Sequence, residues 1–444
     1  DSLPRDAAID ILLRRPGRRV AGAPASFALS RLDEAAVLDA VRSLDDSYLV
    51  LQGPPGTGKT TYAAHAILSL LQERKRIGVL APSHKVAHNL LDRLGRLAVE
   101  RGRAFCGLHK ASSEQSRYLP APGAGEFVEN VKENDVFGGE YELFSGTAWL
   151  FAKAPPRTLD YLFVDEAGQL PLASVLAAAR AARNVVLLGD PQQLAQISKT
   201  VHPAGIGRSA LEYLLGGEAT VGDRQGILLD LTYRMQRDVC AFVSQISYRG
   251  LLHEDAACNR QSVRSAGLSG AGLRFLPVEH DGNRTASMQE AERIAREIGL
   301  LFEGTLTDRE GRERAIRPDD VIVVTPYNGQ RRLLARIIAQ RTGAHVDVGT
   351  VNKFQGREAH VVFYSMATSS GEEMPRSADF LFERNRLNVA ISRARAMAVV
   401  VASPELLRAQ TPSIETMRLL NALDRFVELA QGCGVASQTS PFSV

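Results

Sequence analysis

The sequence predicts an α/β protein with two parallel-sheet domains in tandem. Its 444 residues exceed what one hydrophobic core usually serves. Short apolar runs also alternate with helical stretches in two separate series, which is typical of parallel strands joined by crossover helices. We expect a lead-in at 1–29, a first domain at 30–212 with a small insertion at about 104–143, a second domain at 213–431, and a flexible tail at 432–444.

Four apolar runs form the first series, and each ends in a polar signature. The runs are 48–52, 77–82, 159–164 and 184–189. The signatures that follow them are Gly53 to Thr61, Pro82 to Lys85, Asp165 with Glu166, and Gly189 to Gln193. The carboxyl ends of parallel strands meet at one edge of the sheet, where ligands bind. We therefore expect these signatures to form one site.

The second series begins after a glycine-rich stretch at 203–226. Its apolar runs are 273–278, 320–325, 345–350, 359–366 and 397–402. Within the first domain, the residues from about 104 to 143 break the alternation with proline and glycine. A structureless loop of that length is uncommon in a compact domain, so we expect a small inserted subdomain or a mobile flap.

A phosphate-binding loop is the clearest chemical motif. Residues 53–60 read G-x-x-x-x-G-K-T between a predicted strand and a predicted helix. Such a loop turns backbone N–H groups and a helix N-terminus toward phosphates, and adds a lysine charge and a hydroxyl for magnesium. Ordinary turn residues would give the same pattern in about one chain in a hundred of this size. The strand-to-helix context favours a nucleoside triphosphate.

Two further signatures extend this site. Asp165 and Glu166 follow a nearly continuous apolar run. In a phosphate-loop enzyme the first carboxylate can hold magnesium and the second can orient or deprotonate the attacking water. Gln193 ends the fourth signature, where its amide can contact a γ-phosphate. The alternatives are a simple acidic turn and a surface glutamine, and the upstream phosphate loop favours the functional interpretation of each.

Composition excludes several classes of protein. No stretch approaches the roughly 20 apolar residues of a membrane span, and the N-terminal residues lack an apolar signal core. A cytoplasmic location is expected. The cysteines Cys106, Cys240, Cys258 and Cys433 form no C-x-x-C pair, which argues against a zinc finger or a disulfide framework and leaves a scattered iron–sulfur set open. The net charge of +3 means that a polyanion would need a local basic groove.

A series of motifs then resembles a known family. The stretches are GPPGTGKTT, APSHKVAHNLL, SGTAWL, VDEAGQ, LLGDPQQL, LTYRMQRDVCAFVSQISYRGLL, VVTPYNGQ, VGTVNKFQGRE and RLNVAISRARA. In order and spacing they are similar to the helicase motifs of superfamily 1, and most to the branch with the nonsense-mediated-decay RNA helicase and the replication-associated nuclease-helicase. The resemblance implies two RecA-like domains that sandwich ATP, with single-stranded nucleic acid lying across them.

The resemblance assigns roles within the first domain. It implies that ATP is bound by Gly53, Pro54, Pro55, Gly56, Thr57, Gly58, Lys59, Thr60 and Thr61. Lys59 would contact the β- and γ-phosphates, Thr60 and Asp165 would hold Mg²⁺, and Glu166 would be the catalytic base. Gln193 would sense the γ-phosphate. Asp33 and Glu34 stand where the family usually has an adenine-reading glutamine, and a carboxylate cannot donate a hydrogen bond to the adenine ring.

The second domain would complete the nucleotide site. The resemblance implies that Arg234 and Arg393 are arginine fingers, whose planar charged forks suit phosphate oxygens. It also places Tyr233 beside the base of the bound nucleotide, and Gly356 and Glu358 toward the sugar and phosphates of that nucleotide.

Strand contacts are assigned by the same resemblance. They are Pro82, Ser83, Gly146 and Thr147 in the first domain, and Pro326, Tyr327, Thr350 and Asn352 in the second. Small polar residues suit a grip on phosphates that is blind to sequence. Trp149, the only tryptophan, could stack on a base, but we expect it in the hydrophobic core.

The sequence thus predicts an ATP-driven helicase or translocase on single-stranded nucleic acid, with DNA and 5′-to-3′ movement favoured by the resemblance. An alternative is a nucleotide-dependent clamp or assembly factor without unwinding. Some bacterial relatives look like a RecB-type nuclease fused ahead of such a helicase. The first residue is Asp1 rather than methionine, so an upstream nuclease domain in the same polypeptide is a further expectation.

Overall fold

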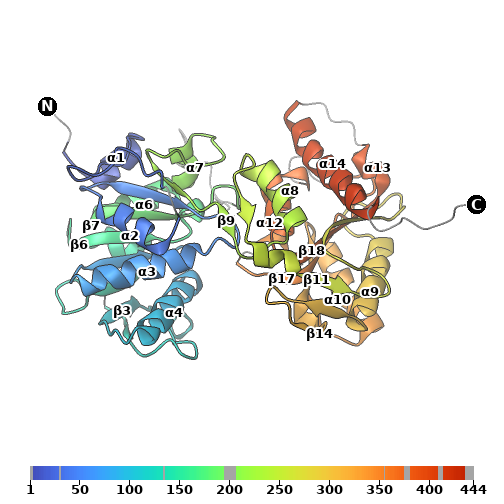
Figure 1. Cartoon of the computed structure of the whole chain (residues 1–444), viewed down its shortest axis with the longest axis horizontal. Helices are drawn as coiled ribbons and strands as arrows, with labels where there is room; N and C mark the ends of the chain where they lie inside the picture. Colours follow the sequence, from blue (N-terminus) through green and yellow to red (C-terminus); the bar gives the residue numbers. More distant parts are fainter. Residues whose placement is uncertain are drawn as a thin grey trace, which may run out of the picture. The chain divides into compact units, whose positions relative to one another are not determined.

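The computed structural model divides the chain into two compact units, which are described separately (Figure 1). It describes residues 4–29, 32–133, 136–194, 207–354, 356–374, 381–408 and 414–435. Unit 1 comprises Asp1–Pro54 and Gly58–Leu229, and unit 2 comprises Pro55–Thr57 and Asp230–Val444. The division falls after Leu229 rather than after the expected residue 212, because the last strand of the first sheet lies between these positions.

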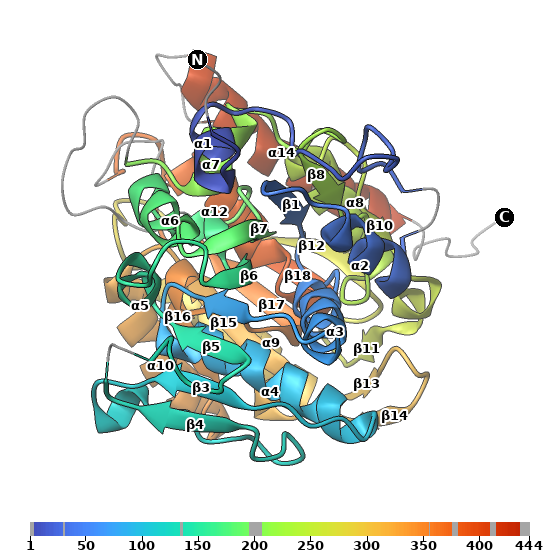
Figure 2. The ribbon, with the colours of Figure 1, turned by 90° about the vertical axis from the view of Figure 1, so that its left-hand side faces the viewer.

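Unit 1 is built on a parallel sheet of eight strands in the order β4-β3-β5-β2-β6-β7-β1-β8 (Figure 2). The strands are β1 (Tyr48–Gln52), β2 (Ile77–Leu80), β3 (Gly107–Lys110), β4 (Val128–Val131), β5 (Leu143–Gly146), β6 (Leu159–Val164), β7 (Ala182–Gly189) and β8 (Gly226–Leu228). The four predicted apolar runs correspond to β1, β2, β6 and β7. The predicted α/β class is confirmed.

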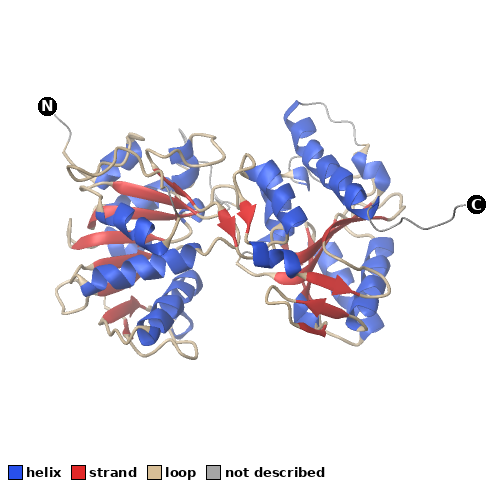
Figure 3. Cartoon of the chain, in the orientation of Figure 1, coloured by secondary structure: helices blue, strands red, loops and turns tan. Residues whose placement is uncertain are grey.

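Helices cover both faces of this sheet (Figure 3). They are α1 (Ala7–Leu12), α2 (Glu34–Arg42), α3 (Lys59–Gln72), α4 (His84–Glu100), α5 (Ala148–Ala152), α6 (Leu172–Ala179) and α7 (Ala210–Leu215). Successive strand residues point to opposite faces. Leu49 and Leu51 accordingly pack in the core with α2, α3 and α4, whereas Tyr48 and Val50 pack in the core with α1, α5, α6 and α7.

Three boundary expectations differ from the structure. Residues 104–143 extend the sheet through β3 and β4 instead of forming a separate subdomain. The expected lead-in at 1–29 contains α1, whose residues Ala7 and Ile11 are buried in the first unit. Helix α14 continues to Val435, into the expected tail, and residues 436–444 lie outside the described residues.

Unit 2 has a five-stranded parallel sheet in the order β12-β18-β17-β15-β16. These strands are β12 (Gly272–Pro277), β15 (Val321–Thr325), β16 (Asp347–Thr350), β17 (Ala359–Ser365) and β18 (Ala394–Ala402), and they match the five runs of the second predicted series. A parallel pair joins β9 (Leu231–Thr232) to β10 (His253–Glu254). An antiparallel sheet contains β11 (Ser262–Arg264), β13 (Thr305–Thr307) and β14 (Glu313–Ala315).

The helices of unit 2 lie on both faces of its larger sheet. They are α8 (Arg237–Ser247), α9 (Met288–Phe302), α10 (Asn328–Thr342), α12 (Arg384–Ile391), α13 (Pro404–Leu407) and α14 (Ile414–Val435). Helices α9 and α10 bury one face in a shared core, and α8, α12 and α14 pack together on the other side. Short 3-10 helices in the two units are η1 (Glu114–Ser116), η2 (Ala167–Gln169), η4 (Ala256–Arg260), η5 (Pro318–Asp320) and η6 (Val351–Phe354). Among the described helices, none has the length and apolar character that crossing a membrane requires.

Candidate nucleotide and nucleic-acid site

The register of the first sheet gathers the predicted nucleotide signatures at one rim. Gln52 is the register partner of Gly189, and Leu80 is the partner of Val164. The phosphate loop, the acidic pair and the β7 signature therefore follow strands that end side by side. This arrangement is what parallel pairing of the apolar runs requires.

The phosphate loop owes its shape to glycine. Gly58 is the N-cap of α3 and has φ = 79°, a left-handed conformation that side chains disfavour. At Gly53 a Cβ atom would lie 2.8 Å from the Cβ of Lys59, closer than such atoms approach. Helix α3 begins at Lys59, so the first N–H groups of the helix face the end of the loop. The loop therefore has the form of an anion-binding cradle.

Lys59 and the acidic pair form a buried cluster. The Lys59 Nζ atom lies 2.8 Å from Glu166 Oε1 and 3.9 Å from Asp165 Oδ1. Burial raises the pKa of Asp165 to about 6, against the lowering effect of Lys59. Burial also lowers the pKa of Lys59, but the attraction of Glu166 and Asp165 outweighs this effect and the net shift is upward.

These donors fit a divalent cation. Asp165 is only 4% exposed, and its ionised form is disfavoured first by burial and then by the neighbouring Glu166 carboxylate, against the attraction of Lys59. The carboxylate of Asp165 and the hydroxyl of Thr60 are the oxygen donors that Mg²⁺ prefers. Glu166 has φ = 51°, a left-handed conformation that is uncommon for glutamate, and its Oε2 accepts a hydrogen bond from Gln169 Nε2 at 3.1 Å. Backbone strain of this kind is concentrated at functional sites.

Gln193 is held at the end of β7 by a neighbouring acid. Its Nε2 donates to Asp190 Oδ2 at 3.1 Å, and the Gln192 N–H donates to Asp190 Oδ1 at the same distance. Residues 195–206, which follow this signature, lie outside the described residues. The amide of Gln193 thus stands on the same rim as the phosphate loop, with its orientation fixed by Asp190.

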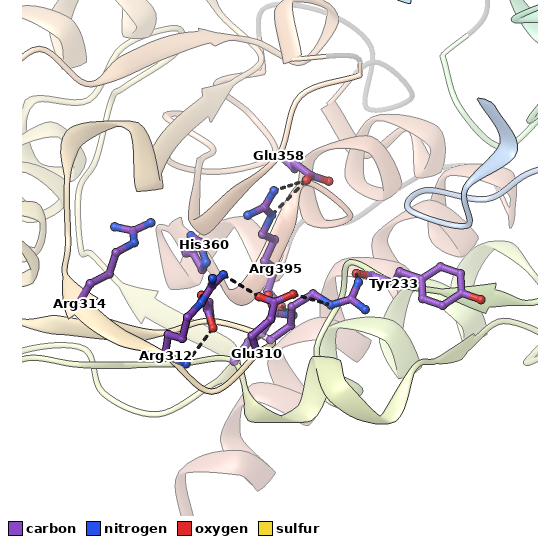
Figure 4. A pocket seen from close by; sticks show the side chains of 10 residues that line it. Tyr233, Glu310, Arg312, Arg314, Glu358, His360 and Arg395 are labelled. Carbon is purple, nitrogen blue, oxygen red and sulfur yellow. Dashed lines mark hydrogen bonds and ion pairs between the residues drawn. The ribbon is translucent and has the colours of Figure 1, made fainter. Parts of the chain in front are cut away.

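In unit 2, Glu358 and Arg395 line a hollow of about 390 Å³ (Figure 4). Arg234 Nε donates to Glu358 Oε2, and Arg234 Nη1 donates to the Ser392 carbonyl at 3.0 Å. Arg395 Nε donates to Glu358 Oε1 at 3.1 Å. Burial raises the pKa of Glu358, but Arg234 and Arg395 together lower it to about 2. Glu358 is therefore a permanent anion between two cations.

The two predicted arginine fingers have different surroundings within this unit. Arg393 is 2% exposed, and its guanidinium donates to the carbonyls of Val389 at 2.9 Å and Arg357 at 3.3 Å. Arg234 instead forms an ion pair with Glu358, and its side chain is 12% exposed. Arg395 belongs to the same motif as Arg393 but was not a predicted site residue, because only its contact with Glu358, distant in sequence, distinguishes it.

Tyr233 and Gly356 also lie in unit 2. Tyr233 is 38% exposed, and the guanidinium of Arg309 lies 5.8 Å from the centre of its ring. Gly356 has φ = 80°, so its turn favours glycine. Tyr233 and Glu358 line the same hollow, which brings two of the predicted nucleotide-binding residues together.

The predicted strand contacts fall at strand ends in each unit. Leu80 pairs with Gly146, which brings the residues after β2 close to Gly146 and Thr147. In the second sheet Thr325 pairs with Thr350. There Pro326 follows β15 and Asn352 follows β16.

These side chains differ in accessibility. Ser83 is exposed and caps α4 by accepting from Val86 N at 3.4 Å, and Pro82 and Thr147 are half-buried. Tyr327 is only 6% exposed, and its hydroxyl accepts a hydrogen bond from Thr368 Oγ1 at 3.3 Å. Tyr327 is therefore built into the fold rather than offered as a stacking surface.

The expectation that Trp149 lies in the core is wrong. Its side chain is 78% exposed, two residues after Thr147 on α5. This short helix buries Leu150 and Phe151 on its inner face, which leaves Trp149 on the outer face. An exposed indole beside predicted strand contacts is suited to stacking on a base.

The carboxylates at the adenine-reading position have structural partners. Asp33 caps α2 by accepting from Ala36 N at 2.9 Å. Glu34 Oε2 lies 2.8 Å from His65 Nδ1.

A group of three histidines, His84, His88 and His109, was not predicted from the sequence, although the H-x-x-x-H spacing of the first two is visible there.

Comparisons with known proteins show what the chain is similar to. Residues 32–203 and 206–405 each match a family model described as an AAA domain. The DNA replication ATP-dependent helicase/nuclease of Gallus gallus is 24% identical over 383 residues, which cover 83% of this chain and 36% of that protein. The ATP-dependent helicase NAM7 of Saccharomyces cerevisiae is 27% identical over 416 residues, which cover 82% of this chain and 40% of that protein.

A solved structure of the Arterivirus nonstructural protein 10 helicase with DNA is 15% identical, with a TM-score of 0.44, and covers 87% of this chain and 64% of that one. The chain spans well under half the length of the two curated relatives named above. Its ordered motifs, its two AAA-domain matches and these relatives show that the chain belongs to the superfamily 1 helicases, in the branch of the replication helicase/nuclease and NAM7.

Proposed function

We propose that the chain is an ATP-driven helicase or translocase that moves along single-stranded nucleic acid, with DNA as the favoured substrate and 5′-to-3′ as the favoured direction. The observation that carries the proposal is the cluster of Lys59, Asp165 and Glu166 beside the glycine-shaped loop. The strand contacts proposed in unit 1 follow neighbouring strands of the same sheet.

The nucleotide chemistry follows from this cluster. The triphosphate would be bound by the loop N–H groups and by Lys59, which would exchange its contact with Glu166 for phosphate oxygens. Thr60 and Asp165 would hold Mg²⁺, which neutralises phosphate charge. The carboxylate of Glu166, released from Lys59, would accept a proton from the attacking water, and Gln193 would contact the γ-phosphate.

Arg234 and Arg393 as arginine fingers, with Tyr233, Gly356 and Glu358 as nucleotide contacts, are predictions of the family resemblance. An arginine finger contributes about 10³ to 10⁵ in rate in phosphoryl-transfer enzymes. Arg234→Lys keeps the charge but loses the planar fork, so we expect a fall in kcat with little change in KM. Because Arg234 also binds Glu358, thermal melting of the variant must show an intact fold before the kinetics are interpreted.

The proposed contacts with the nucleic-acid strand depend on exposed and half-buried residues of unit 1. Ser83, Thr147 and Trp149 follow strands that end side by side, and they combine hydroxyl groups with an exposed aromatic ring. This combination suits a sequence-tolerant grip on phosphates and bases. The name of the Gallus gallus relative refers to DNA replication, which favours DNA as the substrate of this chain.

The test is the ATPase rate with and without a single-stranded oligonucleotide. Lys59→Ala and Glu166→Gln should each abolish stimulated hydrolysis, whereas the surface variants Lys153→Ala and Glu100→Gln should retain it. Hydrolysis that survives both site variants, or that never responds to an oligonucleotide, would contradict the proposal. Matched DNA and RNA oligonucleotides in competition decide the substrate.

A fork-unwinding assay decides between a motor and a clamp. Substrates with a 5′ tail or a 3′ tail should be unwound unequally, and 5′-tailed forks should be preferred. A clamp would hydrolyse ATP without separating either fork or displacing a protein roadblock. An upstream nuclease domain remains a separate prediction, and the reading frame ahead of Asp1 tests it.

A further inference from the structure

Three histidines of unit 1 direct their ring nitrogens toward one point. His84 Nδ1 lies 3.0 Å from His109 Nε2, and His88 Nε2 lies 3.3 Å from the same atom. One nitrogen from each ring falls within 4.8 Å of the other two. His109 is fully buried, and the other two are half-buried. The cluster contains none of the residues proposed to bind nucleotide.

Secondary structure explains why the three rings meet. His84 and His88 are four residues apart on α4 and therefore share one face of the helix. His109 lies on β3, and its register partner on β5 is Ser145. The Ser145 hydroxyl is 3.1 Å from His109 Nδ1, on the side of the ring away from the other histidines. Helix and strand thus hold the rings independently of any ligand.

Hydrogen bonds alone do not satisfy all of the ring nitrogens that face one another in this cluster. A neutral imidazole has one N–H donor and one acceptor nitrogen. His109 Nε2 faces two other ring nitrogens, so either one proton serves two acceptors or one lone pair serves two donors. A cation between three lone pairs would use every facing nitrogen.

We propose that His84, His88 and His109 form a binding site for a transition-metal ion of the Zn²⁺ class. Imidazole nitrogen suits Zn²⁺ and its neighbours, whereas Mg²⁺ and Ca²⁺ prefer oxygen. Tetrahedral geometry with Zn–N distances of 2.0–2.1 Å separates ligand nitrogens by about 3.3–3.4 Å. The two short separations here are 3.0 and 3.3 Å.

The surroundings complete the site. His109 Nδ1–H can donate to Ser145 Oγ, which fixes the tautomer that leaves Nε2 free to bind the metal. Three protein ligands leave a fourth position for water. The metal would fasten the first turns of α4, which begins just after the proposed strand contact Ser83, to β3. The site is independent of the proposed ATPase activity and can exist without it.

The direct test is metal binding by the purified chain after treatment with a chelator. Co²⁺ should bind with one-to-one stoichiometry and give the intense visible absorption of a tetrahedral complex, and Zn²⁺ should displace it. Mg²⁺ at the same concentration should not displace it. Zn²⁺ should also raise the melting temperature of the wild-type protein.

Two variants and one control assign the ligands. His84→Ala and His88→Ala should each weaken Co²⁺ binding at least tenfold, and His345→Ala, on the surface of unit 2, should not. Circular dichroism and wild-type-like melting without metal would show that the variants are folded. The proposal is overturned if the wild-type protein binds no stoichiometric Co²⁺, or if folded variants bind it as tightly as the wild type. Because neither assay measures ATP hydrolysis, failure here leaves the proposed motor function standing.

Discussion

Replacing Asp165 by asparagine should stabilise the protein while it abolishes Mg²⁺-dependent hydrolysis. Burial raises the pKa of Asp165 from an ordinary value of 3.8 to about 6. A carboxyl with a raised pKa stabilises the folded state fully below its unfolded pKa, and that stability is lost as pH rises through the folded pKa. At pH 7.5 the ionised side chain therefore opposes folding.

The expected gain in folding stability can be calculated from the pKa shift of Asp165. A difference of about 2.2 pKa units corresponds to about 3 kcal/mol at 1.36 kcal/mol per unit. Asparagine keeps an oxygen for the Glu166 N–H, which Asp165 Oδ1 accepts at 2.9 Å, but gives up the attraction of Lys59 at 3.9 Å. We therefore expect about 1.5 to 3 kcal/mol of added stability at pH 7.5.

Urea denaturation of both proteins at several pH values measures this difference. The stability gap should narrow by roughly half between pH 7.5 and pH 5, because the wild-type carboxyl gains its proton in that range. MgATP should raise the melting temperature of the wild-type protein more than that of the variant. An asparagine variant that is less stable at pH 7.5, or a gap that does not change with pH, would refute the reasoning.

Three further predictions concern other parts of the site. Trp149→Ala should lower oligonucleotide affinity by about 1–3 kcal/mol without changing basal ATPase, whereas Leu119→Ala, at a similarly exposed position, should have no effect in fluorescence anisotropy. Glu358→Gln should cost about 1–2 kcal/mol at pH 7 after allowance for solvent screening. The cost should shrink as pH falls below 4.5 toward 2, and a pH-independent cost in denaturation would count against the ion pairs. Gly58→Ala should destabilise the loop by about 1–2 kcal/mol through its φ of 79° alone, since an added Cβ meets only Tyr62 at 3.9 Å. Unchanged stability of this variant would contradict the strain argument.

Much of the fold could be predicted because the central strands are strongly apolar. The runs that became β1, β6 and β17 are buried on both faces of a sheet and contain few polar residues. By contrast, β3 and β4 have the sequences GLHK and VENV, which are short and carry polar side chains. Such strands are defined by pairing with a neighbour rather than by local pattern, so a single sequence predicted an insertion where the sheet continues.

Some residues of the candidate site could likewise be predicted from local sequence, and others could not. The spacing of the phosphate loop determines which residues approach one another locally, so Gly53 and Lys59 could be placed from sequence. The contact of Arg395 with Glu358 joins residues far apart in the chain, and no local pattern predicts it. Trp149 was misplaced because a tryptophan is usually buried, whereas a five-residue helix has too little inner surface to bury every apolar side chain it carries.

The pairing of β8 with β1 has a mechanical consequence. The N–H of Leu229 donates to the carbonyl of Gln52 at 2.9 Å, and Gly53 begins the phosphate loop at the next peptide. The chain leaves unit 1 immediately afterwards, at Asp230. The segment that leads into unit 2 at Asp230 is therefore anchored one hydrogen bond from the start of the phosphate loop. Deleting a single residue from 226–229 would shift the pairing of this segment with β1 by one residue. The side chains of the segment would then point to the opposite faces of the sheet.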